Sequence, residues 1–105
     1  MPYNGVTMHV GLCRVSLRLP ENDTLKGKRQ VLRSITDRVR HRYNVAIAEV
    51  EDNDSRRSIV LGLSCVSNDG RHANEMLSKV VEYIDSIRGD AELVDYQIEV
   101  INTLT

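Results

Sequence analysis

The residues of this chain with the clearest chemical potential are basic, and most of them fall in one short stretch. Between positions 26 and 42 the sequence has seven lysines and arginines and a single acidic residue, Asp37. The seven are Lys26, Lys28, Arg29, Arg33, Arg38, Arg40 and Arg42. A concentration of positive charge on one segment attracts polyanions. The sequence therefore predicts a nucleic-acid-binding segment, with RNA as the expected partner.

The rest of the chain has the opposite charge. Residues 1–42 contain nine basic and three acidic residues, a net charge of +6, whereas residues 43–105 contain five and twelve, a net charge of −7. A run of charge is often only the solvated side of a helix. In residues 26–42 nearly all the charged residues are positive, which favours a binding role.

No pattern typical of catalysis or metal binding accompanies these charges. The histidines, which belong to three different predicted elements, are His9, His41 and His72. They form no i, i+4 pair and no zinc-type cluster with cysteine. Glu49 and Glu51 are expected on one side of a strand, at a solvated acidic end. We therefore predict no catalytic residue, no metal and no cofactor, and a protein that is not an enzyme.

Length and composition indicate one globular domain in 105 residues. Residues 1–7 lack the basic start and apolar run of a signal peptide, and no apolar stretch approaches the roughly 20 residues that span a bilayer. We expect a cytoplasmic protein that does not bind membranes. Cys13 and Cys65 are then expected to be buried free thiols, since two cysteines outside CxxC spacing make no disulfide scaffold.

Helical periodicity is present in residues 25–43 and 71–88. Asp23 or Thr24 can cap the first helix, and Gly89 can end the second. Gly27 is expected to weaken the first turn. Lys28 lies on the apolar side of its helix, so we expect it to extend past the helix start into solvent or to bind a partner. Lys28→Met is expected to keep or raise the melting temperature, while it weakens the partner interaction more than Lys26→Met does.

Strand periodicity is present in residues 6–19, 44–52, 57–67 and 91–101. In the first, the apolar positions change from even to odd numbers. This change predicts a bulge near Cys13 or Arg14, or a strand buried on both faces at one end. In the last, four residues are expected on the core side: Val94, Tyr96, Ile98 and Val100.

The order β-α-β-β-α-β predicts an α+β, ferredoxin-like fold. Two right-handed crossovers give a four-stranded antiparallel sheet of order 4-1-3-2, with both helices on one face. The expected core includes Leu32, Ile35, Leu61, Leu63, Leu77, Val81, Ile84 and Ile98. The other sheet face would be open, with apolar residues on it that favour a partner or a dimer. Candidates there are Ala46, Ala48, Val60 and Val66.

Four segments occur in a distinctive order: VGLCRVSLRLP (10–20), TLKGKRQVLRSITDRVRHRYNVAIAEV (24–50), VLGLSCVSND (60–69) and ELVDYQIEVI (92–101). Together they resemble the YlxP-like proteins, a family of small uncharacterised bacterial proteins. The resemblance covers residues 8–101 and implies a ferredoxin-like fold and no established activity. In many bacteria the gene neighbours those for translation initiation factor two and ribosome-binding factor A, which associates the family with ribosome or RNA work.

The resemblance also bears on individual positions. Lys26, Lys28 and Arg29 match the Leu-Lys-x-Lys-Arg start of the family's first helix. Arg56 stands where many members have tryptophan, although a guanidinium can also stack on a base. Because the family usually begins near Met8, residues 1–7 are interpreted as an N-terminal extension and residues 8–105 as the single domain.

The function we expect is that of a non-catalytic accessory protein that binds RNA or a ribosomal particle. The basic helix 25–43 would contact the phosphate backbone, since the central strands lack aromatic residues to stack bases. The alternative is a self-associating interaction or small-ligand module that dimerises through the open sheet face and has no nucleic-acid role. A hydrolase of acylphosphatase type is disfavoured, because LPENDT (19–24) follows the first strand in place of a Gly-rich loop.

Overall fold

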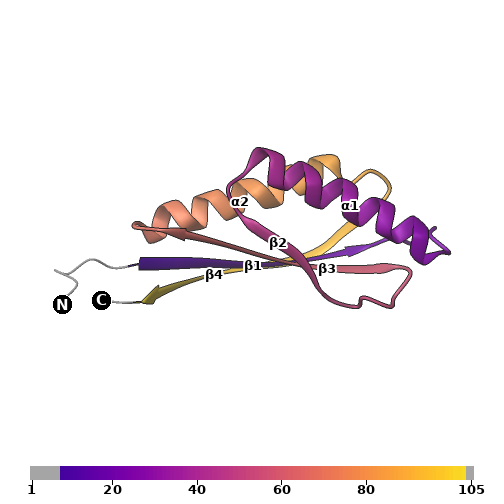
Figure 1. The fold of residues 1–105 in the computed structure, drawn as a ribbon, viewed down its shortest axis with the longest axis horizontal. Coiled ribbons are helices and arrows are strands. Elements are labelled where there is room, and N and C mark those ends of the chain that lie inside the picture. The colour runs from indigo at the N-terminus through magenta and orange to yellow at the C-terminus, as the bar shows by residue number, and fades with distance from the viewer. Residues whose placement is uncertain (1–7, 104–105) are drawn as a thin grey trace.

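The computed structural model describes residues 8–103 (Figure 1). Its elements follow the predicted order β-α-β-β-α-β. They are β1 (Met8–Arg18), α1 (Leu25–Arg42), β2 (Ala46–Glu51), β3 (Ser58–Ser67), α2 (Gly70–Ile87) and β4 (Glu92–Thr103). The predicted N-terminal extension, residues 1–7, lies outside the described residues.

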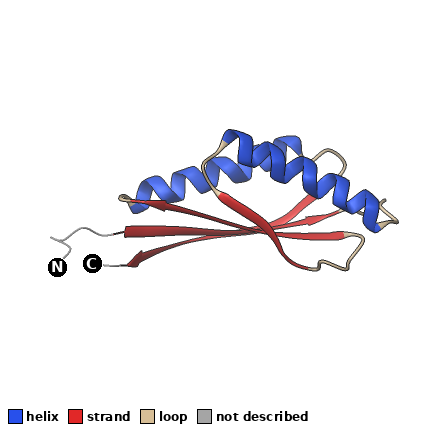
Figure 2. Ribbon diagram, in the orientation of Figure 1, coloured by secondary structure: helices blue, strands red, loops and turns tan. Residues whose placement is uncertain are grey.

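The four strands form one antiparallel sheet in the order β2-β3-β1-β4. This is the predicted order counted from the opposite edge. Both helices cover the same face of the sheet (Figure 2). The α+β, ferredoxin-like arrangement is thus confirmed, and the second face of the sheet carries no helix within residues 8–103.

The core fills the layer between the sheet and the helices and is mainly aliphatic. Six of the eight expected core residues are buried: Ile35, Leu61, Leu63, Leu77, Val81 and Ile84. The other two, Leu32 and Ile98, are partly buried and pack against the edge of the core. The predicted inner faces of α1, α2 and β3 are therefore correct.

Strand β1 keeps one alternation throughout, contrary to the prediction. The odd-numbered residues from Gly11 to Leu17 are all buried and face the helices. The even-numbered residues Met8 and Leu12 are 36% and 38% exposed. Pairing with β3 runs without a break from His9 to Arg18. The predicted bulge near Cys13, and the alternative of burial on both faces, are both wrong. The even-numbered apolar residues simply belong to the open face of the sheet.

The irregularity lies in the pairing of β1 with β4, where the register changes between Ser16 and Leu17. An extra residue enters β4 there, which shifts the alternation of the strand. As a result Leu93 packs against the core, while Val94 is 58% exposed. The expectation that Val94 lies on the core side is wrong, and Tyr96, on the edge strand, is half exposed.

Both helices have the expected end signals. The Thr24 hydroxyl accepts from the Gly27 backbone N–H at 2.9 Å, and Asp69 caps α2. Gly89 closes α2 with a φ of +61°, a conformation that favours glycine. Gly27 also has a packing role, because a Cβ there would overlap the side chain of Asn22. Its replacement by alanine is therefore not the simple gain in helix propensity that the sequence suggests.

Lys28 is the largest departure from the sequence prediction. Its side chain is 1% exposed, and its ammonium lies beneath α1 against the β2–β3 hairpin. Nζ is 2.8 Å from Oε2 of Glu49 and donates to the carbonyl oxygens of Asp52 and Asn53 at 2.5 and 3.4 Å. The ammonium does not extend into solvent, because these oxygens solvate it inside the protein. Lys28 is therefore removed from the predicted nucleic-acid-binding residues.

Glu49 faces Lys28 because it lies on the same side of β2 as the buried Ile47, and the strand becomes irregular only after it, at Val50. Glu49 and Glu51 pair with adjacent residues of β3, so they point to opposite faces of the sheet. The prediction that they share one side is wrong for this reason. Oε2 of Glu49 is buried and makes no hydrogen bond among the described residues, so its contact with Lys28 is an attraction between charges.

The two cysteines are buried free thiols, as predicted. Cys65 pairs with Gly11 and Cys13 with Leu63, which makes the cysteines diagonal neighbours on the helix-facing side of the sheet. Burial raises the pKa of Cys13 from 9.0 to about 11. Burial also raises the pKa of Cys65, although a backbone hydrogen bond from Gly11 opposes the shift. Both groups are therefore protonated and unreactive at neutral pH.

Replacing Lys28 by methionine is expected to destabilise the protein by about 3–5 kcal/mol, because the largely buried Glu49 carboxylate loses its cation. Urea unfolding followed by circular dichroism measures the change. The matched control is Lys26→Met, which alters an exposed residue of the same helix and should change stability by less than about 0.5 kcal/mol. Adding Glu49→Leu to Lys28→Met should restore part of the loss. A loss below about 1 kcal/mol for Lys28→Met would contradict the structural role of the ion pair.

At pH 8 the native thiols are expected to resist a water-soluble disulfide reagent that modifies them rapidly in urea. The unfolded chain releases the Cys13 proton near pH 9, whereas the folded chain holds it until about pH 11. Stability from this group is therefore complete below pH 9 and is lost as the pH rises toward 11. Unfolding measured across this range should depend less on pH in Cys13→Ala. Rapid modification of the native protein at pH 8 would show that the thiols are accessible.

Candidate nucleic-acid interface

The outer face of α1 carries four of the seven predicted residues, all exposed. We call this set the basic face: Lys26, Arg29, Arg33 and Arg40. At 100° per residue their side chains leave the helix within about 60° of one another. Nη2 of Arg40 donates to the carbonyl oxygen of Ile47 at 2.8 Å, which holds this end of α1 against the edge strand β2. The basic face is thus a stripe, interrupted by the exposed Asp37, on a helix that is fixed to the sheet.

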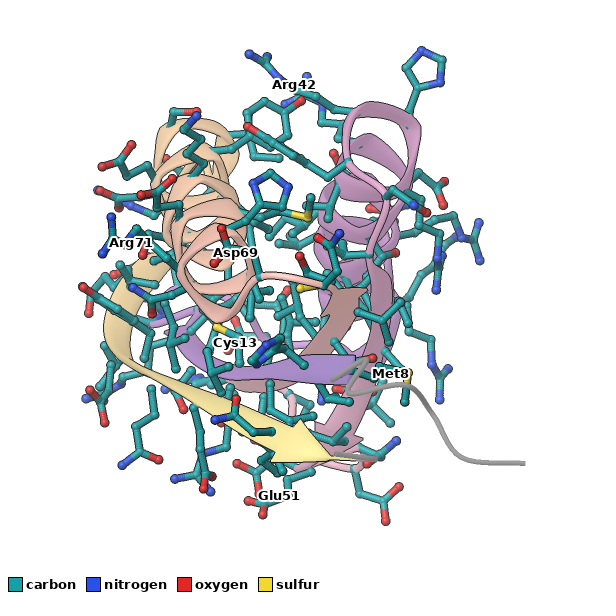
Figure 3. All side chains as sticks on the ribbon, turned by 90° about the vertical axis from the view of Figure 1, so that its left-hand side faces the viewer. Met8, Cys13, Arg42, Glu51, Asp69 and Arg71 are labelled. Atoms are coloured by element: carbon teal, nitrogen blue, oxygen red, sulfur yellow. The ribbon has the colours of Figure 1, made fainter. Side chains whose placement is uncertain are left out.

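Arg38 and Arg42 lie apart from the basic face, on the flank of α1 that borders α2. Cζ of Arg42 lies over the ring of Tyr83, 4.7 Å from its centroid. Figure 3 shows Arg42 between the two helices, on the side remote from the sheet. Arg38 lines a surface hollow that also includes Arg42 and Tyr83. The fold therefore divides the seven predicted residues into the basic face, this flank pair and the buried Lys28.

The β2–β3 loop adds two arginines that were not among the predicted binding residues. Nη1 of Arg56 donates to the carbonyl oxygen of Asp23 at 3.2 Å. Arg57 donates through Nε to the carbonyl oxygen of Asn22 and pairs through Nη2 with the Asp23 carboxylate at 2.9 Å. These contacts bring the loop, with Arg56, to the start of α1. The two arginines are visible in the sequence, but their place beside α1 follows only from the fold.

Few of these positive charges are neutralised. Within residues 8–103 the basic residues in ion pairs are Lys28, Arg40, Arg57 and Arg88. The pair of Arg40 with Asp37 is 3.7 Å long and exposed, so it is worth little. Lys26, Arg29, Arg33 and Arg56 have no acidic partner in that part of the chain. Their field is directed to solvent from one side of the molecule.

The histidine, cysteine and acidic residues form no metal site in the described range. Residues 8–103 contain no group of three or more side chains able to hold a metal ion. The histidines lie on β1, α1 and α2, as expected. At the acidic end of β2, Glu49 pairs with Lys28, and Asp52 accepts from the Ser58 hydroxyl at 2.7 Å in a turn with a φ of 58°. Neither α1 nor α2 is long and apolar enough to cross a membrane.

The open sheet face holds exposed apolar residues, as expected. Of the predicted residues, Val66 is 68% exposed and both alanines are exposed, whereas Val60 is buried in the middle of the sheet. Residues that the sequence analysis did not assign to this face include Met8, Leu12, Val50 and Ile101. A shallow hollow of about 490 Å³ lies over it. Its lining includes Leu12, Ala46, Ala48, Val50, Gly62 and Ser64.

Comparison with known proteins agrees with the resemblance found in the sequence. Uncharacterized protein YlxP of Bacillus subtilis (strain 168) is 30% identical over 77 residues, which cover 73% of this chain and 84% of that protein. Among solved structures, the de novo designed protein Foldit4 has 14% identity and a TM-score of 0.48, with 93% of this chain and 98% of that chain covered. The family described as "Protein of unknown function (DUF503)" matches residues 10–98. The chain therefore belongs to the DUF503 family, in which YlxP-like proteins are found.

Proposed function

We propose that this protein is a non-catalytic accessory protein that binds the phosphate backbone of RNA, free or exposed on a ribosomal particle. The observation that carries the proposal is the set of unpaired, exposed cations on one side of the molecule. They are Lys26, Arg29 and Arg33 of the basic face and Arg56 in the adjacent loop. Phosphate contacts from lysine and arginine release condensed counterions, which supplies affinity without sequence specificity.

The spacing of the basic face suits a nucleic-acid strand. Lys26 and Arg33 are seven residues apart, which is about 10 Å along a helix. That length allows the side chains at its two ends to contact different phosphates of one strand. Arg56 continues the surface past the start of α1, where its loop is hydrogen-bonded to residue 23. The surface is therefore longer than the helix stripe predicted from sequence.

The open sheet face is poorly suited to reading bases. Its central strands, β1 and β3, contain no aromatic residue. Sheet-based RNA recognition relies on aromatic side chains on such strands to stack two or three bases. This composition supports binding through charge on α1 in preference to sequence readout on the sheet.

The combined substitution of Lys26, Arg29 and Arg33 by glutamate is expected to abolish RNA binding. Each lost phosphate contact on single strands should also reduce the slope of log affinity against log salt by about 0.7. Fluorescence anisotropy with labelled RNA across a salt series measures both effects. Co-sedimentation with ribosomal subunits across the same series tests for a particle as partner.

The control is Arg71→Glu combined with Lys79→Glu, which places negative charge on exposed positions of α2. It should weaken binding far less than the α1 variant does. Circular dichroism establishes that both variants are folded. Equal RNA affinity of the parent and the α1 variant would reduce the basic face to a solvated surface and overturn the proposal.

A second candidate function is self-association through the open sheet face. The hollow on this face has Arg14 and Glu99 along one side, on neighbouring strands. In a two-fold dimer each arginine can face the glutamate of the other copy, so the face is complementary to itself. Exposed Leu12 and Val66 would then be covered. The occupant we propose for this face is a second copy of the chain.

Leu12→Glu is expected to convert such a dimer to a monomer, because it places a carboxylate in the apolar contact. Sedimentation equilibrium measures the mass, at low and at high salt. Screening should weaken the Arg14–Glu99 part of the contact and leave the apolar part. Asn74→Glu, at an exposed position of α2, is the control and should leave the mass unchanged. A monomeric parent at all salt concentrations would exclude this candidate.

A further inference from the structure

A second feature of α1 separates Arg42 from the phosphate-binding cations. The Arg42 guanidinium lies over the Tyr83 ring at 4.7 Å and is 5.8 Å from the centroid of the Tyr43 ring. The two rings meet edge to face, with centroids 5.6 Å apart and an interplanar angle of 62°. Three planar groups thus gather where the end of α1 meets α2. We call this cluster the stacking corner: Arg42, Tyr43 and Tyr83.

The cluster lies at the end of α1 and on α2 and is open on one side. Tyr43 and Tyr83 are partly buried and pack against the core, whereas Arg42 is exposed. A shallow surface hollow adjoins it, lined by Asp37, Arg38, His41, Arg42 and Tyr83. The rings therefore hold one side of the guanidinium in place, while the residue remains accessible from solvent. Figure 3 shows Arg42 at the outer surface of the helical layer.

Such an arrangement has the properties of a nucleobase subsite. Guanidinium planes and aromatic rings both stack on bases in single-stranded RNA. A guanidinium already held over a ring loses less side-chain freedom when a base is added, because its position is set beforehand. Arg38, in the same hollow, can neutralise the phosphate next to a stacked base.

We propose that the stacking corner binds one unpaired base of an RNA strand that crosses the outer surface of α1 from the basic face to the flank beside α2. The inference rests on the proposed function, because it names the substrate class of the same helix as single-stranded RNA. In an A-form duplex the bases are stacked on one another, so their faces are not available to Arg42. The protein therefore prefers single strands to duplexes of equal length.

The test compares three probes: a short oligoadenylate strand, the same strand with abasic sites in its centre, and an oligoadenylate–oligouridylate duplex of equal length. The parent protein is expected to bind the intact strand at least about fivefold more tightly than the abasic strand. Arg42→Lys keeps the positive charge but not the planar group, and should remove most of that preference. The chain has four tyrosines and no tryptophan, so quenching of tyrosine fluorescence by the intact strand provides a second signal.

Arg71→Lys is the matched control, since it makes the same exchange at an exposed arginine about three helical turns from Tyr83 on α2. It should retain the preference for the intact strand. Tight binding of intact and abasic strands with equal affinity would overturn the base subsite and leave the phosphate-binding proposal in place. Retention of the full preference by Arg42→Lys would also overturn it. Failure of the parent to bind any of the probes would overturn the proposed function, and this inference with it.

Discussion

The ion pair of Lys28 and Glu49 determines how the first helix sits on the sheet. It joins the first turn of α1 to the β2–β3 hairpin, and the same ammonium donates to two carbonyl oxygens of the hairpin loop. Because residues advance by 100° along a helix, turning Lys28 inward turns Lys26 and Arg29 toward solvent. One buried charge therefore orients the exposed ones. The pairing also places the loop, with Arg56, beside the start of α1.

The sheet separates two surfaces of different character. On the helical side, α1 presents cations that have few acidic neighbours, and Arg42 meets Tyr83 where the two helices approach. On the other side, the strands present apolar residues around a shallow hollow, with Arg14 and Glu99 at its margin. A polyanion on the first surface and a second copy of the chain on the other would not compete for the same residues. The two candidate functions are therefore compatible in one molecule.

Features that depend on neighbouring residues were predictable from the sequence. The element order, the antiparallel sheet and the inner faces of α1, α2 and β3 all follow from the hydrophobic period, and helix ends follow from capping residues such as Thr24 and Gly89. Predictions of which side a strand residue faces were wrong where the strands are irregular. Val50 and Val94 are extra residues opposite regular partners, and nothing in the local sequence distinguishes them from paired strand residues. The apolar residues on the open face of β1 led to another wrong prediction, that the core-facing side of this strand changes along its length.

The sequence by itself determined the fold class and the concentration of positive charge between positions 26 and 42, because both are properties of residue order and composition. Tertiary structure alone decided which of those charges are exposed and which other groups lie beside them. It buried Lys28 against Glu49, joined Arg56 to the start of α1 and placed Arg42 over Tyr83. The physical reason is that each of these contacts joins segments more than twenty residues apart. Their approach depends on how the helices pack on the sheet, which no local period specifies.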